Sequence, residues 1–240
     1  MSRILVLAPS GFGKTTSIGS IPELGLVGLN PKETFIIQVK GKPLPFSNAG
    51  DYVITTTAEV LAGKINGNRI IERNPEQVAL LLLKLVGTGF VNVVLDDTNY
   101  LMQDWYMANA LKSGWDAPKK IGYFMGRLFA SVELYEDTKQ NVIILAHGEY
   151  VAGKDGREYV KLKTTGKMVD EYITPEGLFD VTLLGKSRFD MTAKKVVKEY
   201  ITNEDENYSS AKSPYGMFKS LYIPNDLGLV VKTIHEFQNK

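Results

Sequence analysis

Side chains that could act on a phosphate group stand in three short stretches of the sequence. One contains Lys14 and Thr15 after a glycine-rich turn, another is Asp96-Asp97, and the third is His147. A lysine among glycines binds phosphate oxygens, whereas hydroxyl and carboxylate oxygens are the ligands that Mg²⁺ prefers. These residue types together indicate a site for a nucleotide and its metal ion.

The turn matches the phosphate-binding pattern G-x-x-x-x-G-K-[ST] at Gly13, Lys14 and Thr15, with Ala8 in place of the first glycine. Alanine is small enough to keep the match. Gly11 and Gly13 permit positive φ and let backbone N–H groups close on phosphate oxygens. A structural turn between a strand and a helix is the alternative, but the spacing and the apolar run just before the turn favour phosphate binding.

The nucleotide phosphates are expected to contact Ser10, Gly11, Phe12, Gly13, Lys14, Thr15 and Thr16. Lys14 should reach the β- and γ-phosphates, and the Thr15 hydroxyl should ligate Mg²⁺. Residues 16–21 are expected to form a helix, which Gly19 and β-branched residues weaken. The N–H groups and the dipole at its start should face the same anion.

Two apolar runs, residues 90–95 and 141–146, predict buried parallel strands that end at Asp96-Asp97 and at His147. The carboxyl ends of parallel strands meet at one edge of a sheet. We therefore expect these polar residues to lie beside the glycine-rich turn.

Each of these polar residues has an expected role. Asp96 should hold Mg²⁺, directly or through water, and His147 should sense the γ-phosphate. Asp97 could orient the attacking water or cap the helix that starts near Asn99, because Asp is a favoured N-cap. The sequence leaves both roles of Asp97 open.

Composition sets broad limits. The 240 residues are 44% hydrophobic and 23% charged, with a formal net charge of +1 and no cysteine. These values are typical of a globular protein, and they exclude disulfides and thiolate metal sites. A global basic field for nucleic acid is absent, so any such binding needs a local patch. With no signal peptide and no apolar run of membrane-spanning length, we expect a soluble cytoplasmic protein.

The remaining pattern predicts an α/β fold, with residues 1–240 as a single domain. Strands are expected over residues 4–7, 34–39, 52–57, 90–95 and 141–146, and helices over 75–86, 99–112, 119–139 and 226–237. Residues 148–176 read as a mobile loop or a hairpin. Residues 179–184, 196–202 and 217–223 suggest late strands without helices between them, and therefore antiparallel additions to the sheet.

The order of these features resembles a reduced RecA/RadA-type ATPase core, with a mostly parallel central sheet and helices on both faces. More closely, the chain resembles phage-encoded ATP-binding single-strand annealing proteins of the Sak type. Three stretches carry this resemblance beyond the turn. They are FIIQVKGKPLPF at residues 35–46, GLFDV at 177–181 and AKSPYGMF at 211–218.

The resemblance implies an ATPase that is stimulated by DNA and that anneals or pairs single-stranded DNA in phage recombination. Its cofactors would be ATP and Mg²⁺. Its partners would be single-stranded DNA, further copies of the chain in a ring or filament, and a single-strand-binding protein, with no membrane. In related recombinases the loop after the sensing strand meets DNA, which corresponds here to Lys161, Lys163 and Lys167.

RadA-like proteins also send basic residues of a late Lys-x-Arg-Phe-Gly motif to the neighbouring subunit's γ-phosphate. Lys186 and Arg188 match this motif better by letters, whereas Lys212 matches it better by order along the fold. We favour Lys212 as the catalytic cation. Pro214 then stands where the arginine would be.

Two other functions compete with this interpretation. A small-molecule kinase on the same scaffold usually has an arginine-rich lid, but Arg157 is the one arginine in residues 148–176. A nucleotide-gated assembly protein with little hydrolysis is the second alternative.

Overall fold

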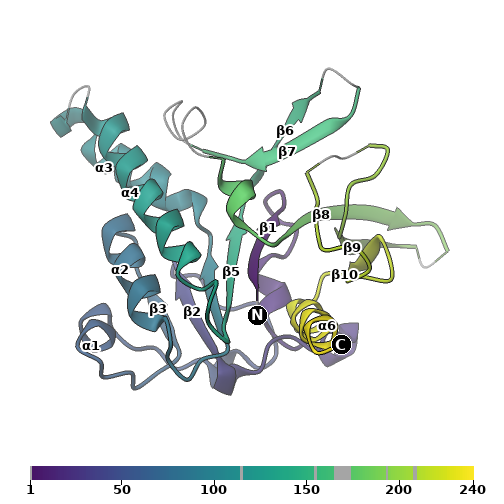
Figure 1. Cartoon of the computed structure of the whole chain (residues 1–240), viewed down its shortest axis with the longest axis horizontal. Helices are drawn as coiled ribbons and strands as arrows, with labels where there is room; N and C mark the ends of the chain where they lie inside the picture. Colours follow the sequence, from purple (N-terminus) through teal and green to yellow (C-terminus); the bar gives the residue numbers. More distant parts are fainter. Residues whose placement is uncertain (1, 114–115, 154–155, 165–173, 193, 208–209) are drawn as a thin grey trace.

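The computed structural model describes residues 2–113, 116–153, 156–164, 174–192, 194–207 and 210–240. A large sheet is built from β1 (Arg3–Leu7), β2 (Thr34–Gln38), β3 (Arg69–Ile71), β4 (Asn92–Asp96), β5 (Asn141–Ala146), β8 (Val181–Asp190), β9 (Lys195–Ile201) and β10 (Tyr222–Pro224). Its eight strands lie in the order β10-β9-β8-β1-β5-β4-β2-β3 (Figure 1). β9 and β10 are antiparallel to their neighbours, and the other pairs are parallel.

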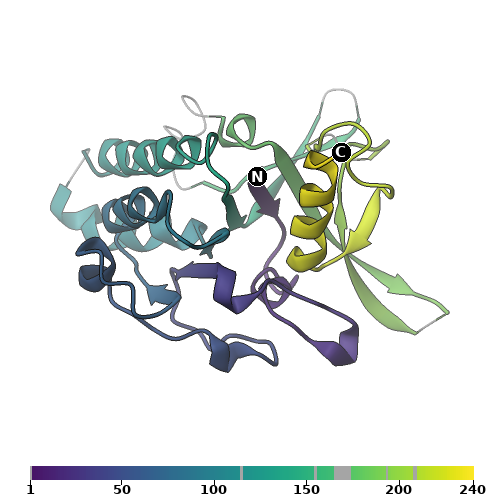
Figure 2. The same ribbon diagram turned by 60° about the horizontal axis from the view of Figure 1, so that its bottom comes forward.

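Helices cover both faces of this sheet. α1 (Thr57–Leu61), α2 (Pro75–Leu85), α3 (Asn99–Ser113) and α4 (Asp116–Glu133) belong to one side, and α6 (Leu227–Gln238) belongs to the other. Figure 2 shows α6 apart from the group formed by α2, α3 and α4. The predicted α/β fold, with a mostly parallel sheet, helices on both faces and antiparallel strands toward the C-terminus, is confirmed.

The two faces have separate cores because successive residues of a strand point to opposite sides. Leu5 and Val93 pack in the core that includes α2 and α4. Ile4 and Val94 pack in the core that includes α6. Strands that are buried on both faces need continuous apolar sequences. For this reason β1, β4 and β5 could be predicted from apolar runs in the sequence.

The prediction that the late strands all add in antiparallel fashion is wrong for β8. β8 runs parallel to β1, with Ile4 opposite Val181 and Leu7 opposite Leu184. A parallel neighbour requires a long crossover connection. Among the residues that the structure describes, the crossover from β5 contains a hairpin and the short 3-10 helix η5 (Pro175–Leu178).

Two further local predictions are wrong. Residues 52–57 form no strand beyond an isolated bridge between Ile54 and Arg69, and α1 begins at Thr57 behind a capping box. The helix expected over residues 16–21 is a single 3-10 turn, η1 (Thr15–Ile18). It ends at Gly19, whose backbone is extended; the ring of Phe46 packs so close to this residue that a Cβ would not fit there.

Within residues 148–176, the part that the structure describes contains the hairpin alternative. β6 (Gly148–Ala152) and β7 (Glu158–Leu162) pair as an antiparallel two-stranded sheet that projects from the body of the molecule (Figure 1). Lys167 lies outside the described residues. In the part of the chain that the structure describes, every helix is too short or too polar to cross a membrane.

Candidate functional site

The glycine-rich turn follows β1 at the carboxyl edge of the sheet. Gly11 has a φ of 76° and Gly13 a φ of 101°, the left-handed values that the pattern predicts. Late residues hold the turn from outside. Lys198 Nζ donates to the carbonyl of Gly11 at 2.8 Å, and Asn225 Nδ2 donates to that of Gly13 at 3.1 Å.

Ala8 is tolerated in the first glycine position because its neighbour on β8 is Gly185. A Cβ built on Gly185 would lie 2.5 Å from the Ala8 Cβ and 2.7 Å from the ring of Phe12. Gly185 has no side chain, and this leaves room on the adjacent strand for the methyl group of Ala8. Phe12 itself is buried and stacks near Tyr200, with ring centroids 5.8 Å apart.

Lys14 is only 5% exposed. Its Nζ donates to the carbonyls of Ala8 and Pro9 at 3.0 and 3.2 Å and lies 3.3 Å from His147 Nδ1. Burial lowers the pKa of Lys14 to about 8. Burial and the charge of Lys14 also lower the pKa of His147, so the neutral imidazole can accept a hydrogen bond from the ammonium group. The expected approach of His147 to Lys14 is confirmed by this contact.

Thr15 and Asp96 form the pair expected at a magnesium site. Thr15 Oγ1 donates to both carboxylate oxygens of Asp96, at 3.1 and 2.9 Å. Asp96 is fully buried, and burial together with the charge of Asp97 raises its pKa to about 7. A hydroxyl and a carboxylate at this spacing are hard oxygen donors, and Mg²⁺ in phosphate sites takes one or two carboxylates beside phosphate and water. The residues present therefore fit the ion.

Asp97 presents its carboxylate to Lys42 and not to the start of α3. The main-chain carbonyl of Asp97 accepts from the N–H of Tyr100, whereas its carboxylate lies 3.5 Å from Lys42 Nζ. The residue has a φ of 66°, unusual for an aspartate. The capping alternative for the carboxylate is therefore not what the structure has.

These elements enclose a cleft of about 250 Å³. Its lining consists of Ser10, Gly11, Gly13, Lys14, Thr15, Thr16, Lys42, Pro45, Asp97, Tyr100, His147 and Lys198. Of the residues predicted to contact phosphate, Phe12 alone is absent from the lining. Its side chain packs in the core, and its N–H donates to the carbonyl of Pro9. Contact between Phe12 and phosphate therefore stays a prediction for its backbone alone.

Three lysines line the cleft against one carboxylate, so its electrostatic character favours an anion. Of these lysines, Lys14 was predicted from the sequence, whereas Lys42 and Lys198 were not. Lys42 follows the carboxyl end of β2, and the strand-end argument used for Asp96 and His147 would have found it. Lys198 gave no comparable signal, because it comes to the turn from the antiparallel strand β9.

The structure has no long helix directly after Lys14 whose dipole could face the phosphate site, because η1 (Thr15–Ile18) follows there. η1 is only four residues long, and a single turn sums too few peptide dipoles to act as a helix terminus. Its turn is instead held by Ser17, whose hydroxyl donates to the carbonyl of Lys14 at 2.6 Å and accepts from Tyr200 at 2.8 Å.

The other predicted cations stand elsewhere. Lys212 forms a backbone bridge with Thr182 near the beginning of β8, at the amino edge of the sheet. Its positive charge helps to lower the pKa of Asp180. Arg188 Nε lies 2.6 Å from Glu199. Neither residue lines the cleft of its own chain.

Two of the candidate DNA contacts lie on the hairpin. Lys161 is exposed on β7. Lys163 follows β7 at its base, where its N–H donates to the carbonyl of His147 at 2.8 Å. The Asn99 amide joins the two segments by contacting the backbone of His147 and of Lys163. The base of the hairpin is thus connected to the cleft through His147.

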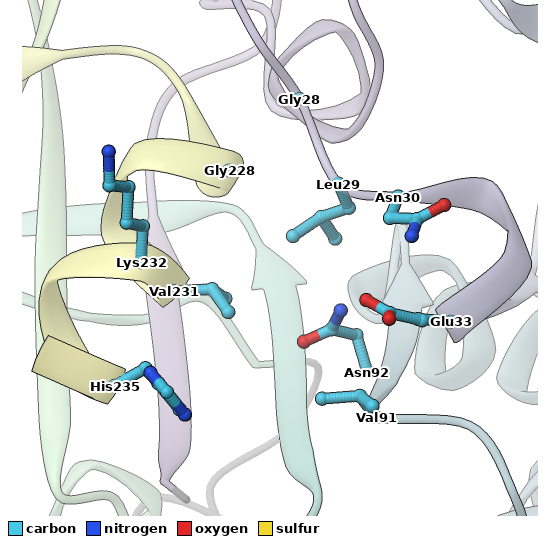
Figure 3. Close-up of a pocket in the computed structure, with 10 residues that line it drawn as sticks. All are labelled: Gly28, Leu29, Asn30, Glu33, Val91, Asn92, Gly228, Val231, Lys232 and His235. Carbon is cyan, nitrogen blue, oxygen red and sulfur yellow. The ribbon is translucent and has the colours of Figure 1, made fainter. Parts of the chain in front are cut away.

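A second groove, of about 380 Å³, lies at the other edge of the sheet (Figure 3). Its lining includes Glu33, His235 and Asn92. Asn92 begins β4 and Asp96 ends it, so this groove is separate from the cleft. The Asn92 amide is already bonded to Thr34 and Asn141.

Comparisons with known proteins do not identify the function of this chain. The chain matches no family model and no curated protein sequence. Among solved structures it is similar to a KaiC-like protein from the hyperthermophilic archaeon Pyrococcus horikoshii OT3. The identity is 11% and the TM-score 0.42, over 83% of this chain and 78% of that protein.

Proposed function

We propose that the protein binds ATP with Mg²⁺ in the cleft at the glycine-rich turn and hydrolyses it, on a RecA-like core. The observation that carries this proposal is that Lys14, Thr15 and Asp96 lie together at a turn with two glycines of positive φ. A buried lysine, a hydroxyl and a carboxylate around an otherwise cationic cleft match the needs of a metal-bound polyphosphate.

The residues divide the work of hydrolysis. On binding, Lys14 exchanges the carbonyls of Ala8 and Pro9 for β- and γ-phosphate oxygens, and His147 keeps it oriented. Mg²⁺ held by Thr15 and Asp96 would neutralise charge on these phosphates.

The chemical step itself needs an oriented water. Asp97 lines the cleft and orients this water by accepting a hydrogen bond from it. The water oxygen bonds to the γ-phosphorus, the bond to the β–γ bridging oxygen breaks, and ADP leaves with that electron pair. The proton of the water passes to Asp97.

The test is the rate of phosphate release by Lys14→Ala with Mg²⁺ and saturating ATP. We expect hydrolysis to be lost, because Lys14 is the buried lysine of the cleft lining and its ammonium group contacts the β- and γ-phosphates in this proposal. Lys84→Ala, which removes an exposed lysine of α2, is the matched control and should retain the wild-type rate. Retained turnover in Lys14→Ala would contradict the nucleotide site.

We further propose that ATP binding is coupled to single-stranded DNA, in annealing or pairing during phage-type recombination. The resemblance of the sequence suggests this role, and the hairpin supports it because Lys163 is tied to His147. Anisotropy of a labelled oligonucleotide should report binding that weakens steeply with salt, since phosphate contacts release counterions. An absence of binding at low salt, with and without ATP, would remove the DNA role.

The competing kinase function has little support. Arg157, the one arginine of residues 148–176, lies 3.1 Å from Glu204. It does not line the cleft.

A further inference from the structure

Lys42 combines an anchored backbone with an available side chain. It lies in the loop after β2, and its carbonyl accepts from Gln38 Nε2 at 3.2 Å and from Arg69 Nη2 at 3.1 Å. Pro43 and Pro45 restrict the backbone that follows. These contacts fix the point from which the side chain extends.

The side chain of Lys42 reaches into the cleft that Lys14 lines. It is 63% exposed, and its Nζ lies 3.5 Å from Asp97 Oδ2. At that distance and exposure an ion pair is weak and readily exchanged for a stronger anion. His147 lines the same cleft.

Lys40 provides the contrast within the same loop. Its Nζ lies 2.6 Å from Asp104 Oδ2 and 4.6 Å from the centroid of the Tyr100 ring. It does not line the cleft. Lys42 Nζ also lies near this ring, 5.4 Å from its centroid. The two lysines differ in their ion pairs and in their position, because Lys42 alone of the pair lines the cleft.

We propose that Lys42 is a second phosphate-binding cation of the cleft, supplied by the same chain as Lys14. It exchanges the Asp97 carboxylate for γ-phosphate oxygens when ATP binds. This inference rests on the proposed ATPase function and adds a catalytic residue to it. It assigns to a residue of the same chain a task that the sequence resemblance assigned only to a neighbouring subunit.

The exchange has a consequence for the reaction. While Lys42 holds Asp97, the carboxylate is occupied; once Lys42 moves to the γ-phosphate, Asp97 is free to accept a hydrogen bond from the attacking water. As the bond between the γ-phosphorus and the bridging oxygen breaks, Lys42 neutralises charge on the equatorial oxygens. Binding of a γ-phosphate would thereby prepare the group that orients the water.

The test compares ATP with ADP in Lys42→Met, which removes the charge and keeps the length of the side chain. With Mg²⁺ present, we expect roughly tenfold weaker ATP binding, the loss of one charged hydrogen bond, and unchanged ADP binding. Single-turnover hydrolysis should fall about 100-fold. Lys40→Met is the matched control and should bind both nucleotides as the wild type does, and Lys42→Arg should recover most of the ATP preference.

Two results would overturn the role of Lys42 and leave the ATPase proposal standing. One is wild-type ATP binding and hydrolysis in Lys42→Met, and the other is an equal loss of ATP and ADP affinity. If the wild-type protein binds neither nucleotide, the ATPase proposal fails and this inference fails with it. Thermal unfolding of each variant, compared with wild type, identifies any loss that comes from misfolding.

Discussion

The carboxylate of Asp96 illustrates the cost of placing a functional charge in the interior. It lies beneath Thr15 with no exposed surface, and its pKa is raised to about 7 by burial and by the charge of Asp97. A pKa that is higher in the folded than in the unfolded protein means that folding disfavours the ionised form. The residue suited to holding a metal therefore destabilises the protein without one.

We predict that Asp96→Asn stabilises the protein when neither Mg²⁺ nor nucleotide is present, and abolishes hydrolysis. At pH 8, above the folded-state pKa, the gain should be about 1–3 kcal/mol of unfolding free energy. The gain should shrink as pH falls through about 7 toward the ordinary value of 3.8, because Asp96 is then protonated in the folded state.

Urea unfolding at pH 8 and pH 5 checks this prediction. Asp104→Asn is the control, since its carboxylate is partly exposed and paired with Lys40 at 2.6 Å; it should leave stability unchanged or slightly lower. A loss of stability in Asp96→Asn at pH 8 would show that the buried charge is fully compensated by its neighbours.

At the scale of elements, the phosphate-binding turn depends on strands that come much later in the chain. β8 supplies Gly185 beside Ala8, and β9 supplies Tyr200, whose hydroxyl bonds to Ser17 at 2.8 Å. The turn is therefore supported by tertiary contacts, where a short helix over residues 16–21 was expected.

We predict that Gly185→Ala lowers stability by about 1–3 kcal/mol, the usual cost of overpacking. The added methyl would lie 2.5 Å from the Ala8 Cβ and 2.7 Å from the Phe12 ring, so the turn must shift. Weaker ATP binding should accompany the loss of stability. Gly177→Ala, at a glycine where a Cβ meets nothing within 4 Å, is the control; equal stability of the two variants would contradict this account of position 8.

These contacts explain what the sequence could and could not predict. Apolar runs that end in Asp96 and in His147 revealed parallel strands and the polar edge they share, because both signals are local. Propensity indicated a weak helix after Lys14, but its reduction to a single turn that ends at Gly19 was not predictable, because the close packing of the Phe46 ring on Gly19 is a tertiary contact. The direction of β8 and the approach of Lys198 depend on the crossover from β5, which has no local signature.

At the scale of the whole molecule, the cleft and Lys212 lie at opposite edges of the sheet. The turn follows the carboxyl end of β1, whereas Lys212 lies near the amino end of β8. A head-to-tail contact would place the Lys212 edge of one subunit against the cleft of the next, and such contacts generate rings or filaments. We propose that Lys212 of the neighbouring subunit acts there as an additional cation, together with Lys14 and Lys42 of the chain that binds the nucleotide.

Assembly of this kind predicts hydrolysis that rises with protein concentration, as light scattering reports growth of the assembly. Lys212→Ala should remove the rise. Adding the Lys14→Ala protein, which retains Lys212, should restore it by completing the sites of its neighbours. A Lys212→Ala protein whose activity still rises with concentration would contradict action between subunits.

The most direct test of the central claim is a calorimetric titration of the nucleotide-binding cleft with ATP and Mg²⁺. The account predicts one site per chain in the wild-type protein and binding at least roughly tenfold weaker in Lys14→Ala, because the buried ammonium makes charged hydrogen bonds to phosphate. Lys84→Ala should titrate as the wild type does. Equal binding by Lys14→Ala and wild type, or no binding by either, would contradict it.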